Sequence, residues 1–267
     1  MRLLALDTAT DLCSAALWID GEVRTREALA PRAHGELILP MVEELLAGAS
    51  LSLGALDAIA FGRGPGAFTG LRLAAGIAQG LALSVQLPLL PVSDLRAVAA
   101  QALAAQAPAA SAPATPPRRA LVCQDARMEE VYWACFERGV GALHLVGDEA
   151  VAAPLAVGLP ASWIGTADAG GIVAAGSGLA AYPLLRVRLA AAVSAWLPDL
   201  YPRAREIAEL AAEDGLACAV APEVALPVYL RDRVTAPAAA APAAPAAQAA
   251  QAAQAALTVQ AAPTSRN

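Results

Sequence analysis

Apolar and polar residues alternate along the first third of the chain in a way that predicts a regular order of strands and helices. Residues 2–6, 12–19 and 22–29 have the period-two pattern or the short apolar runs of strands. Asp20 and Gly21 favour a two-residue hairpin turn between the last two of these strands. The chain therefore opens with three predicted antiparallel strands.

After residue 33 the pattern of apolar residues changes from that of strands to that of a helix. In residues 34–47, apolar side chains recur three and four positions apart. Residues 56–61 follow as a short apolar strand, 69–84 as a helix, 87–92 as a strand and 94–104 as a helix. Three strands followed by alternating helices and strands predict a mixed sheet, in which an antiparallel meander joins parallel βαβ units. This order is typical of a ribonuclease H-like lobe, which occurs twice in actin-like ATPases.

The second half of the chain is less regular. Strands are expected at residues 121–124, 130–136, 142–146 and 163–165, and an amphipathic helix at 203–219. We predict an N-terminal lobe at 1–106, a Pro/Ala linker at 107–118 and a C-terminal lobe at 119–234. Residues 235–267 are almost all Ala, Pro and Gln, and we expect them to be a disordered tail because they bury too little apolar surface.

Composition narrows the possible functions. The chain is 58% hydrophobic and 16% charged, with a net charge of −6, so a broad nucleic-acid-binding face is not expected and any work on RNA would need a partner. The four cysteines are far apart and include no C-x-x-C pair, which argues against a zinc or redox site.

The N-terminus has no signal-peptide pattern, because Asp7 interrupts its short apolar run, and we expect a cytoplasmic protein. Residues 73–92 carry no formal charge and are about long enough to span a bilayer. Gln79, Pro88 and Pro91 within them favour a soluble protein without a membrane span.

A glycine-rich loop between the fourth strand and the second helix is the most informative motif. Two interpretations of it stay open: an anion-binding nest at a helix N-terminus, or a tight turn that lets the helix pack closely against a partner. Thr69 is expected to cap the helix. The residues of this loop motif are Gly64, Pro65, Gly66, Phe68, Thr69 and Gly70.

Several blocks of sequence together resemble the TsaB (YeaZ) family over residues 1 to about 234. They are Asp7-Thr8-Ala9-Thr10, the helix start at 34–40, the loop at 64–72, the pair of blocks Asp125-Ala126-Arg127 and Glu130-Val131-Tyr132, and the chain end Pro227-Val228-Tyr229-Leu230-Arg231. The resemblance implies an actin-like α/β fold with two lobes and mixed sheets.

The resemblance also implies a part in making threonylcarbamoyladenosine beside the anticodon of tRNA. Family members are non-catalytic partners that bind a related catalytic subunit, TsaD, and a small ATPase, TsaE, joins the pair. This chain would then contact tRNA only through the complex. Without its partner it could form a homodimer through the same helices.

The two helices that resemble the contact surface of the family are 34–47 and 69–84. Small residues on the second helix would allow another helix to approach closely, and apolar residues on the first would lie beside them. The alternative, that both stripes belong to the core, stays open. The candidate interface residues are Leu37, Met41, Leu45, Ala74, Gly76, Ala78 and Gly80.

Catalytic residues are not expected. TsaD-like relatives carry a metal-binding His-x-x-x-His motif, and the matching stretch here has Asp94 and Val98 at those positions. The chain has only His34 and His144, so no metal site of neighbouring histidines is predicted. An actin-like ATPase or phosphotransferase, or a glycoprotease-like enzyme, is the alternative function.

Nucleotide binding stays open. Asp7, Thr8 and Thr10 form the turn that holds phosphate in actin-like ATPases, so ATP or ADP with Mg²⁺ could bind there at a partner interface. The loops 168–171 and 176–179 also resemble blocks of this fold, but neither supplies a complete site. Asp125 and Arg127 are interpreted as an ion pair that holds a hairpin turn.

Overall fold

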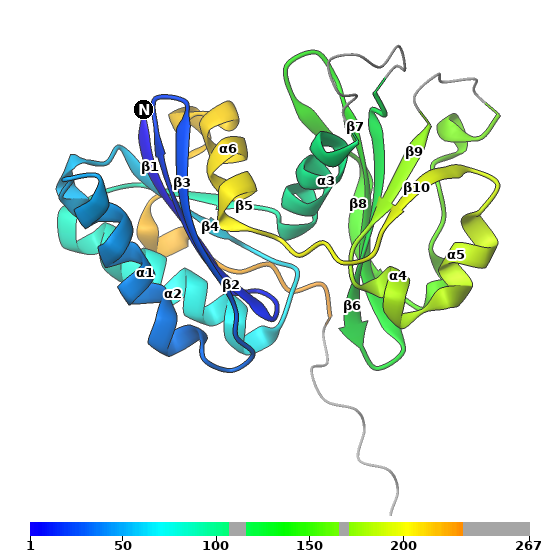
Figure 1. Cartoon of the computed structure of the whole chain (residues 1–267), viewed down its shortest axis with the longest axis horizontal. Coiled ribbons are helices and arrows are strands. Elements are labelled where there is room, and N and C mark those ends of the chain that lie inside the picture. The colour runs from blue at the N-terminus through cyan, green and yellow to red at the C-terminus, as the bar shows by residue number, and fades with distance from the viewer. Residues whose placement is uncertain (107–115, 166–170, 232–267) are drawn as a thin grey trace, which may run out of the picture. The chain divides into compact units, whose positions relative to one another are not determined.

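The computed structural model describes residues 1–106, 116–165 and 171–231. Its first sheet has the strand order β3-β2-β1-β4-β5 (Figure 1). β1 (Arg2–Asp7), β2 (Leu12–Ile19) and β3 (Glu22–Leu29) are antiparallel neighbours, whereas β4 (Ala58–Gly62) and β5 (Leu89–Val92) run parallel to β1. α1 (His34–Gly48), α2 (Phe68–Val85) and α3 (Asp94–Ala105) alternate with these strands. The expected mixed sheet is confirmed, including the turn at Asp20 and Gly21.

The second sheet has the order β10-β9-β6-β7-β8 (Figure 1). Its antiparallel part consists of β6 (Arg119–Arg127), β7 (Glu130–Arg138) and β8 (Leu143–Ala152), and β9 (Ile172–Ala175) and β10 (Val193–Leu197) extend it in parallel. The remaining α-helices are α4 (Gly178–Ala181), α5 (Pro183–Leu189) and α6 (Ala204–Asp214). Short 3₁₀ helices are η1 (Leu53–Ala55), η2 (Pro154–Ala156), η3 (Ala161–Trp163), η4 (Leu216–Cys218) and η5 (Pro222–Val224).

The sequence-based elements differ from the structure mainly in this second half. The strand expected at residues 163–165 is wrong, because Trp163 ends a 3₁₀ turn in which its amide donates to the carbonyl of Pro160. The helix expected to reach residue 219 ends at Asp214, since Gly215 leaves the helical conformation with a φ of +74°. β9, β10 and the short helices between them were not predicted.

Three clusters of buried apolar residues cover the faces of the two sheets. Along β1 the side chains alternate between two of them: Leu4 and Leu6 pack with α1 and α2, whereas Leu3 and Ala5 pack with α3 and α6. The core with α3 and α6 also contains apolar residues of the second sheet. The third core lies on the opposite face of the second sheet, with α4 and α5. β1 is therefore buried on both faces.

α6 follows the second sheet in sequence but packs mainly against β1 and β2 of the first. Its C-terminal residue Asp214 forms a bidentate ion pair with Arg96 of α3, with N–O distances of 2.6 and 2.9 Å. The first sheet therefore also packs against a helix that lies after residue 119, in the predicted C-terminal lobe. Residues 107–115 of the proposed linker and the whole proposed tail lie outside the described residues.

By length and composition alone, α2 is long and apolar enough to cross a membrane, and 28% of it is buried. Core helices of soluble proteins share this property. The uncharged stretch at residues 73–92 is not one continuous helix, because α2 ends at Val85 and β5 begins at Leu89. One face of α2 packs into the core beside α1.

The N-terminus of α2 is held by the turn between β1 and β2. The hydroxyl of Thr8 donates to the carbonyl of Gly70 at 2.7 Å, and the amide of Ala67 donates to the carbonyl of Ala9 at 2.8 Å. A β-carbon at position 70 would overlap the carbonyl oxygen of Thr8 and lie 3.0 Å from its carbonyl carbon. Only glycine allows this approach of two backbones.

We predict that Gly70→Ala lowers the free energy of unfolding by about 2 to 3 kcal/mol, because neither backbone can move away from the added methyl group. Gly76→Ala in the same helix is the control. Its added methyl group would meet nothing within 4 Å, so it should raise the free energy of unfolding by about 0.5 to 1 kcal/mol. Urea unfolding measures both, and equal effects of the two substitutions would contradict the account of this contact.

Candidate functional site

The glycine-rich loop is a compact junction between β4 and α2. Gly64, Pro65 and Gly70 are buried, Gly66 is half-buried, and Phe68 and Thr69 are exposed. α2 begins at Phe68 with Ala67 as its N-cap, and no side chain caps it. The expected cap at Thr69 is therefore wrong, because Thr69 already lies in the first helical turn.

The side chains of the candidate nucleotide-binding residues form hydrogen bonds with backbone groups of the protein itself. Asp7 and Thr8 are buried, and the Thr8 hydroxyl is used by Gly70. Asp7 Oδ1 accepts a hydrogen bond from the amide of Ala9 at 2.7 Å, and Thr10 Oγ1 accepts one from the amide of Leu12 at 3.4 Å. Asp7 and Thr8 thus face the packed interior, where their side chains form hydrogen bonds with the protein's own backbone.

The candidate interface residues divide between core and surface. Met41, Leu45 and Ala78 are buried in the core beneath α1 and α2, and Ala74 is also fully buried. Leu37 is half-buried, and Gly76 and Gly80 are exposed. Only the two glycines of the candidate set are therefore fully available on the surface of this structure.

Four exposed residues one turn apart run along the outer side of α2. We call Arg72, Gly76, Gly80 and Leu83 the α2 stripe. Both glycines have open space where a β-carbon would be, and the Leu83 side chain is 52% exposed. Arg72 is the only charged residue of the helix. The stripe is a shallow, nearly uncharged surface.

The segment at residues 222–231 runs beside α2. Gln79 Nε2 donates to the carbonyls of Pro222 and Ala225 at 3.0 and 3.1 Å. The amide of Val228 donates to the carbonyl of Arg63 in the glycine-rich loop at 2.7 Å. Hydrogen bonds to α2 and to the loop thus fix this segment at both ends.

An aromatic cluster lies at the N-terminal end of the α2 stripe. The Arg72 guanidinium stacks 3.7 Å from the ring centroid of Phe68, and its Nε donates to the Tyr229 hydroxyl at 3.0 Å. The two rings are 5.6 Å apart. Both aromatic residues are partly exposed. Such a cation–aromatic group adds area and a hydrogen-bonding function to an otherwise aliphatic face.

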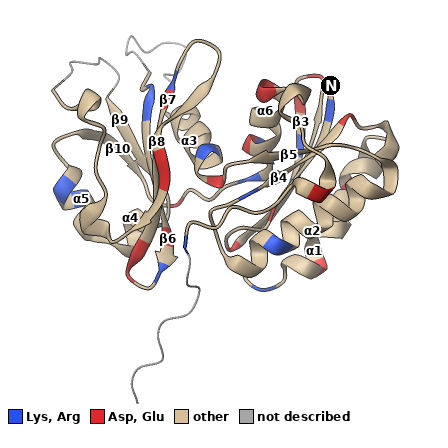
Figure 2. Cartoon of the chain, turned by 180° about the vertical axis from the view of Figure 1, so that it is seen from behind, with Lys and Arg blue, Asp and Glu red and all other residues tan. Residues whose placement is uncertain are grey.

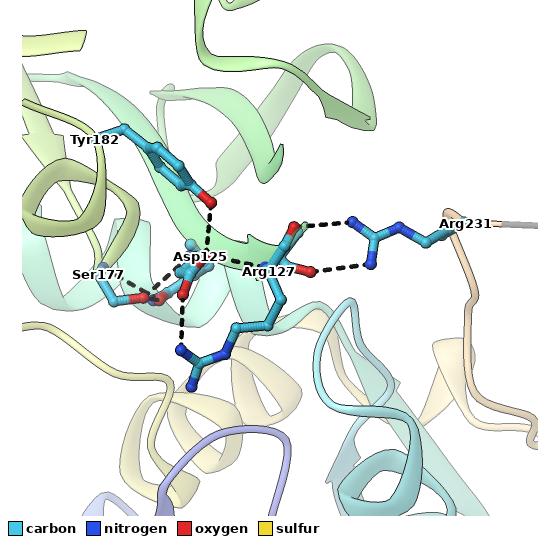
Figure 3. Close-up of polar contacts among 7 residues, drawn as sticks. Asp125, Arg127, Ser177, Tyr182 and Arg231 are labelled. Carbon is cyan, nitrogen blue, oxygen red and sulfur yellow. Dashed lines mark hydrogen bonds and ion pairs between the residues drawn. The ribbon is translucent and has the colours of Figure 1, made fainter. Parts of the chain in front are cut away.

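A polar cluster surrounds Asp125 in the second sheet (Figure 3). Its carboxylate pairs with Arg127 at 3.1 Å and accepts a hydrogen bond from the Tyr182 hydroxyl at 3.2 Å. The expected ion pair at the hairpin is confirmed. Arg231 pairs with Glu130 and donates to the carbonyls of Ala126 and Arg127, so the segment at 222–231 also braces the β6–β7 turn.

These polar groups do not form an activated nucleophile. The Ser177 hydroxyl donates to Gln124 Oε1 at 2.6 Å, and an amide oxygen is not a base that could take its proton. Burial raises the pKa of Cys13 to about 11 and that of Cys135 to about 12, and it raises the pKa of Cys123 further. These three thiols therefore stay protonated and unreactive at neutral pH.

Within the described ranges, no group of three or more His, Cys, Asp or Glu residues could hold a metal ion. His34 begins α1, which packs against the first sheet, whereas His144 lies in β8 of the second sheet. Asp94 and Val98, at the positions of the TsaD-like histidines, are both buried. Strands β3, β6 and β7 each carry both basic and acidic residues (Figure 2). Of the loop 168–171, residues 168–170 lie outside the described ranges.

Sequence reasoning missed two features of this region. The first is the contact between Tyr229 and Arg72, although the block at 227–231 that contains Tyr229 was singled out in the sequence. The second is the proximity of Asp94 to Asp7, for which the sequence has no local signal.

Comparisons with known proteins agree with this architecture. A model of the TsaD family, described as tRNA N6-adenosine threonylcarbamoyltransferase, matches residues 27–244. The tRNA threonylcarbamoyladenosine biosynthesis protein TsaB of Escherichia coli (strain K12) is 40% identical over 249 residues, which cover 88% of this chain and 96% of the relative. The TsaB protein of Haemophilus influenzae is 46% identical over 134 residues, which cover 50% of this chain and 53% of the relative.

Solved structures show the same fold. YeaZ from Pseudomonas aeruginosa has a TM-score of 0.72 and 40% identity, covering 86% of this chain and 99% of the neighbour. A second Pseudomonas aeruginosa structure, described as similar to peptidase YEAZ, has a TM-score of 0.74 and 41% identity with the same coverage. The two mixed sheets and this likeness confirm the actin-like α/β fold class. The chain belongs to the TsaB family of tRNA threonylcarbamoyladenosine biosynthesis proteins.

Proposed function

We propose that this chain is a non-catalytic scaffold and activator subunit in the threonylcarbamoyladenosine modification of tRNA. It binds a TsaD-like catalytic homologue through the α2 stripe, and a TsaE-like small ATPase joins the pair in the cytoplasm. The chain reaches tRNA only as part of this complex. It can pair with itself through the same stripe when the catalytic subunit is lacking.

The observation that carries this proposal is the open surface of the α2 stripe. Gly76 and Gly80 are exposed, have no atoms near their missing side chains, and are followed by the exposed Leu83. Glycine costs stability in the middle of a helix, so two glycines one turn apart favour a role that needs a close approach. Another helix could pack here at a short interaxial distance.

The chemistry of the stripe favours a protein partner. With Arg72 as the only charge on α2, it lacks the cluster of basic residues that binds a phosphate backbone. Phe68 and Tyr229 flank the stripe at one end and provide aromatic contact area, which is typical of interface hot spots. Because the chain matches the TsaD family model, a TsaD-like subunit would share this fold and could offer a similar helix.

The non-catalytic part of the proposal is supported by the surroundings of the candidate reactive groups. Val98 is in the core and Asp94 is engaged with the glycine-rich loop, so the positions of the TsaD-like histidines serve packing here. The Ser177 hydroxyl and the buried thiols lack the partners that would activate them.

We predict that the purified chain and a TsaD-like homologue form a complex of defined mass in light scattering. The interaction is expected because the α2 stripe leaves apolar area exposed in the isolated chain. Addition of ATP and the small ATPase should increase that mass. Two components that keep their separate masses under all of these conditions would contradict the scaffold function.

We further predict that Gly80→Glu weakens this complex roughly 100-fold or more, because it buries an unpaired charge between two helices. The fold should not suffer, since glutamate favours a helix more than glycine does and position 80 has open space. Gly158→Glu is the matched control, because position 158 also has open space and lies in the second half of the chain, outside the α2 stripe. Isothermal titration calorimetry measures both, and equal affinities of the two variants would refute the choice of surface.

A further inference from the structure

Asp7 and Asp94 form a pair of carboxyl groups in the interior of the protein. Asp7 ends β1 and Asp94 begins α3, and their exposed fractions are 0% and 1%. Both approach the α-carbon of Gly62, where a β-carbon would clash with Asp94 Oδ1 and lie 3.0 Å from Asp7 Oδ1. The absence of a side chain at residue 62 thus leaves the space in which the two groups meet.

Each carboxyl group has one bonded and one unbonded oxygen. Asp7 Oδ1 accepts from the amide of Ala9 at 2.7 Å, and Asp94 Oδ2 accepts from the amide of Gly64. Asp7 Oδ2 and Asp94 Oδ1 are buried without a hydrogen-bond donor in the described part of the chain. Two neighbouring buried carboxyl groups that each leave one oxygen without a donor are costly, unless a proton lies between the groups.

The charged and titratable neighbours of the pair do not neutralise it. The Cys13 thiol on β2 lies near Asp7, and its pKa is raised to about 11, so it stays a neutral thiol and brings no charge to the pair. The Arg63 guanidinium acts on Asp94 from the glycine-rich loop, but it is paired with Glu149 of β8 at 3.0 Å. The other carboxyl of the pair is the strongest electrostatic neighbour of Asp94.

Two adjacent buried carboxyl groups cannot both be ionised cheaply. Burial raises the pKa of Asp7 from 3.8 to about 7, and burial together with the charge of Asp7 raises the pKa of Asp94 well above its ordinary value. The two groups titrate as a pair, and one proton remains while the other leaves. A divalent cation would need more oxygen ligands than these two residues supply.

The pair joins the two segments that position α2. Asp7 fixes the turn that contacts the start of the helix through the Thr8 hydroxyl and the Ala9 carbonyl. Asp94 fixes the glycine-rich loop at Gly64. Repulsion between two carboxylates would push the turn at residues 8–10 away from the glycine-rich loop. The N-terminal end of the α2 stripe, which both segments position, would then move as well.

We propose that Asp7 and Asp94 share a single proton, and that this proton holds the glycine-rich loop against residues 8–10, so that the α2 stripe is well positioned below neutral pH and loosened above it. The effect on partner binding rests on the docking function proposed above. The shared proton itself does not, and the two parts can be tested separately.

The sign of the effect on stability follows from the direction of the pKa shifts. The folded protein keeps the shared proton at pH values where the unfolded chain has lost it. Unfolding therefore releases protons between pH 3.8 and about 7, and the free energy of unfolding falls as the pH rises through this range. Below pH 3.8, and above the pH at which the folded pair has lost its last proton, the pair adds no further pH dependence.

The first test compares urea unfolding of the full chain, of Asp94→Asn and of Asp148→Asn at pH 5 and pH 8. The amide of Asp94→Asn can donate to Asp7 in place of the proton, whereas Asp148 is exposed and serves as the control for the loss of one charge. The unfolding equilibrium constant of the wild type and of the control should rise with pH about tenfold more than that of Asp94→Asn. Parallel pH profiles of all three proteins would overturn the shared proton.

A second measurement needs no substitution. In the wild type labelled with carbon-13 at the aspartate carboxyl groups, NMR should show one of the two resonances titrating with a midpoint near pH 7. Titration of every aspartate below pH 5 would overturn the proposal. Stabilisation of the wild type by Mg²⁺ at pH 8, absent in Asp94→Asn, would overturn it in favour of a cation.

The third measurement tests the link to docking. The affinity of the wild type for the TsaD-like homologue should fall at least about threefold between pH 6.5 and pH 8.5, and that of Asp94→Asn should change less. The same pH dependence in both proteins would overturn the link. If neither protein binds at either pH, both the proposed docking function and its link to the proton are wrong. The unfolding and NMR measurements then still test the shared proton by themselves.

Discussion

The close contact between the turn at residues 8–10 and the start of α2 is the constraint on which the rest of the structure depends. It brings the backbone of Gly70 against the carbonyl of Thr8, at a distance that excludes any side chain. This contact sets the angle at which α2 leaves β4, and therefore decides which residues of the helix enter the core. Ala74 and Ala78 are buried as a result, and Gly76 and Gly80 remain on the surface. The proposed docking surface is thus a consequence of how the helix begins.

Residues 222–231 extend this arrangement to the second sheet. Tyr229 contacts Arg72 beside the α2 stripe, and two residues later Arg231 pairs with Glu130 and braces the β6–β7 turn. A partner that binds the stripe would therefore touch a segment that also supports the Asp125 cluster (Figure 3). One short segment connects the proposed docking surface with the hairpin of the second sheet.

The first sheet could be predicted almost completely from the sequence, because its strands alternate or are fully apolar and Asp20-Gly21 specifies the first hairpin. β9 and β10 were not predicted: β9 is a four-residue apolar run within a stretch rich in alanine and glycine, and β10 does not alternate. The exposure of the candidate interface residues was only partly predictable. Alanine is small and apolar in the core and on the surface alike, so the sequence did not show that Ala74 and Ala78 face inward while Gly76 faces out. The Asp7–Asp94 pair forms because Asp7 ends β1, Asp94 follows β5, and these two strands lie on either side of β4 in the parallel part of the sheet. No local sequence pattern indicates this contact.

Hydrogen–deuterium exchange of the chain, alone and mixed with a TsaD-like homologue, tests the central claim most directly. The account predicts that amide groups of α2, together with those at residues 222–231, become protected in the mixture, while β8 and α5 exchange as before. Protection confined to the second sheet, or no protection although a complex forms, would contradict the claim that this family member docks through α2.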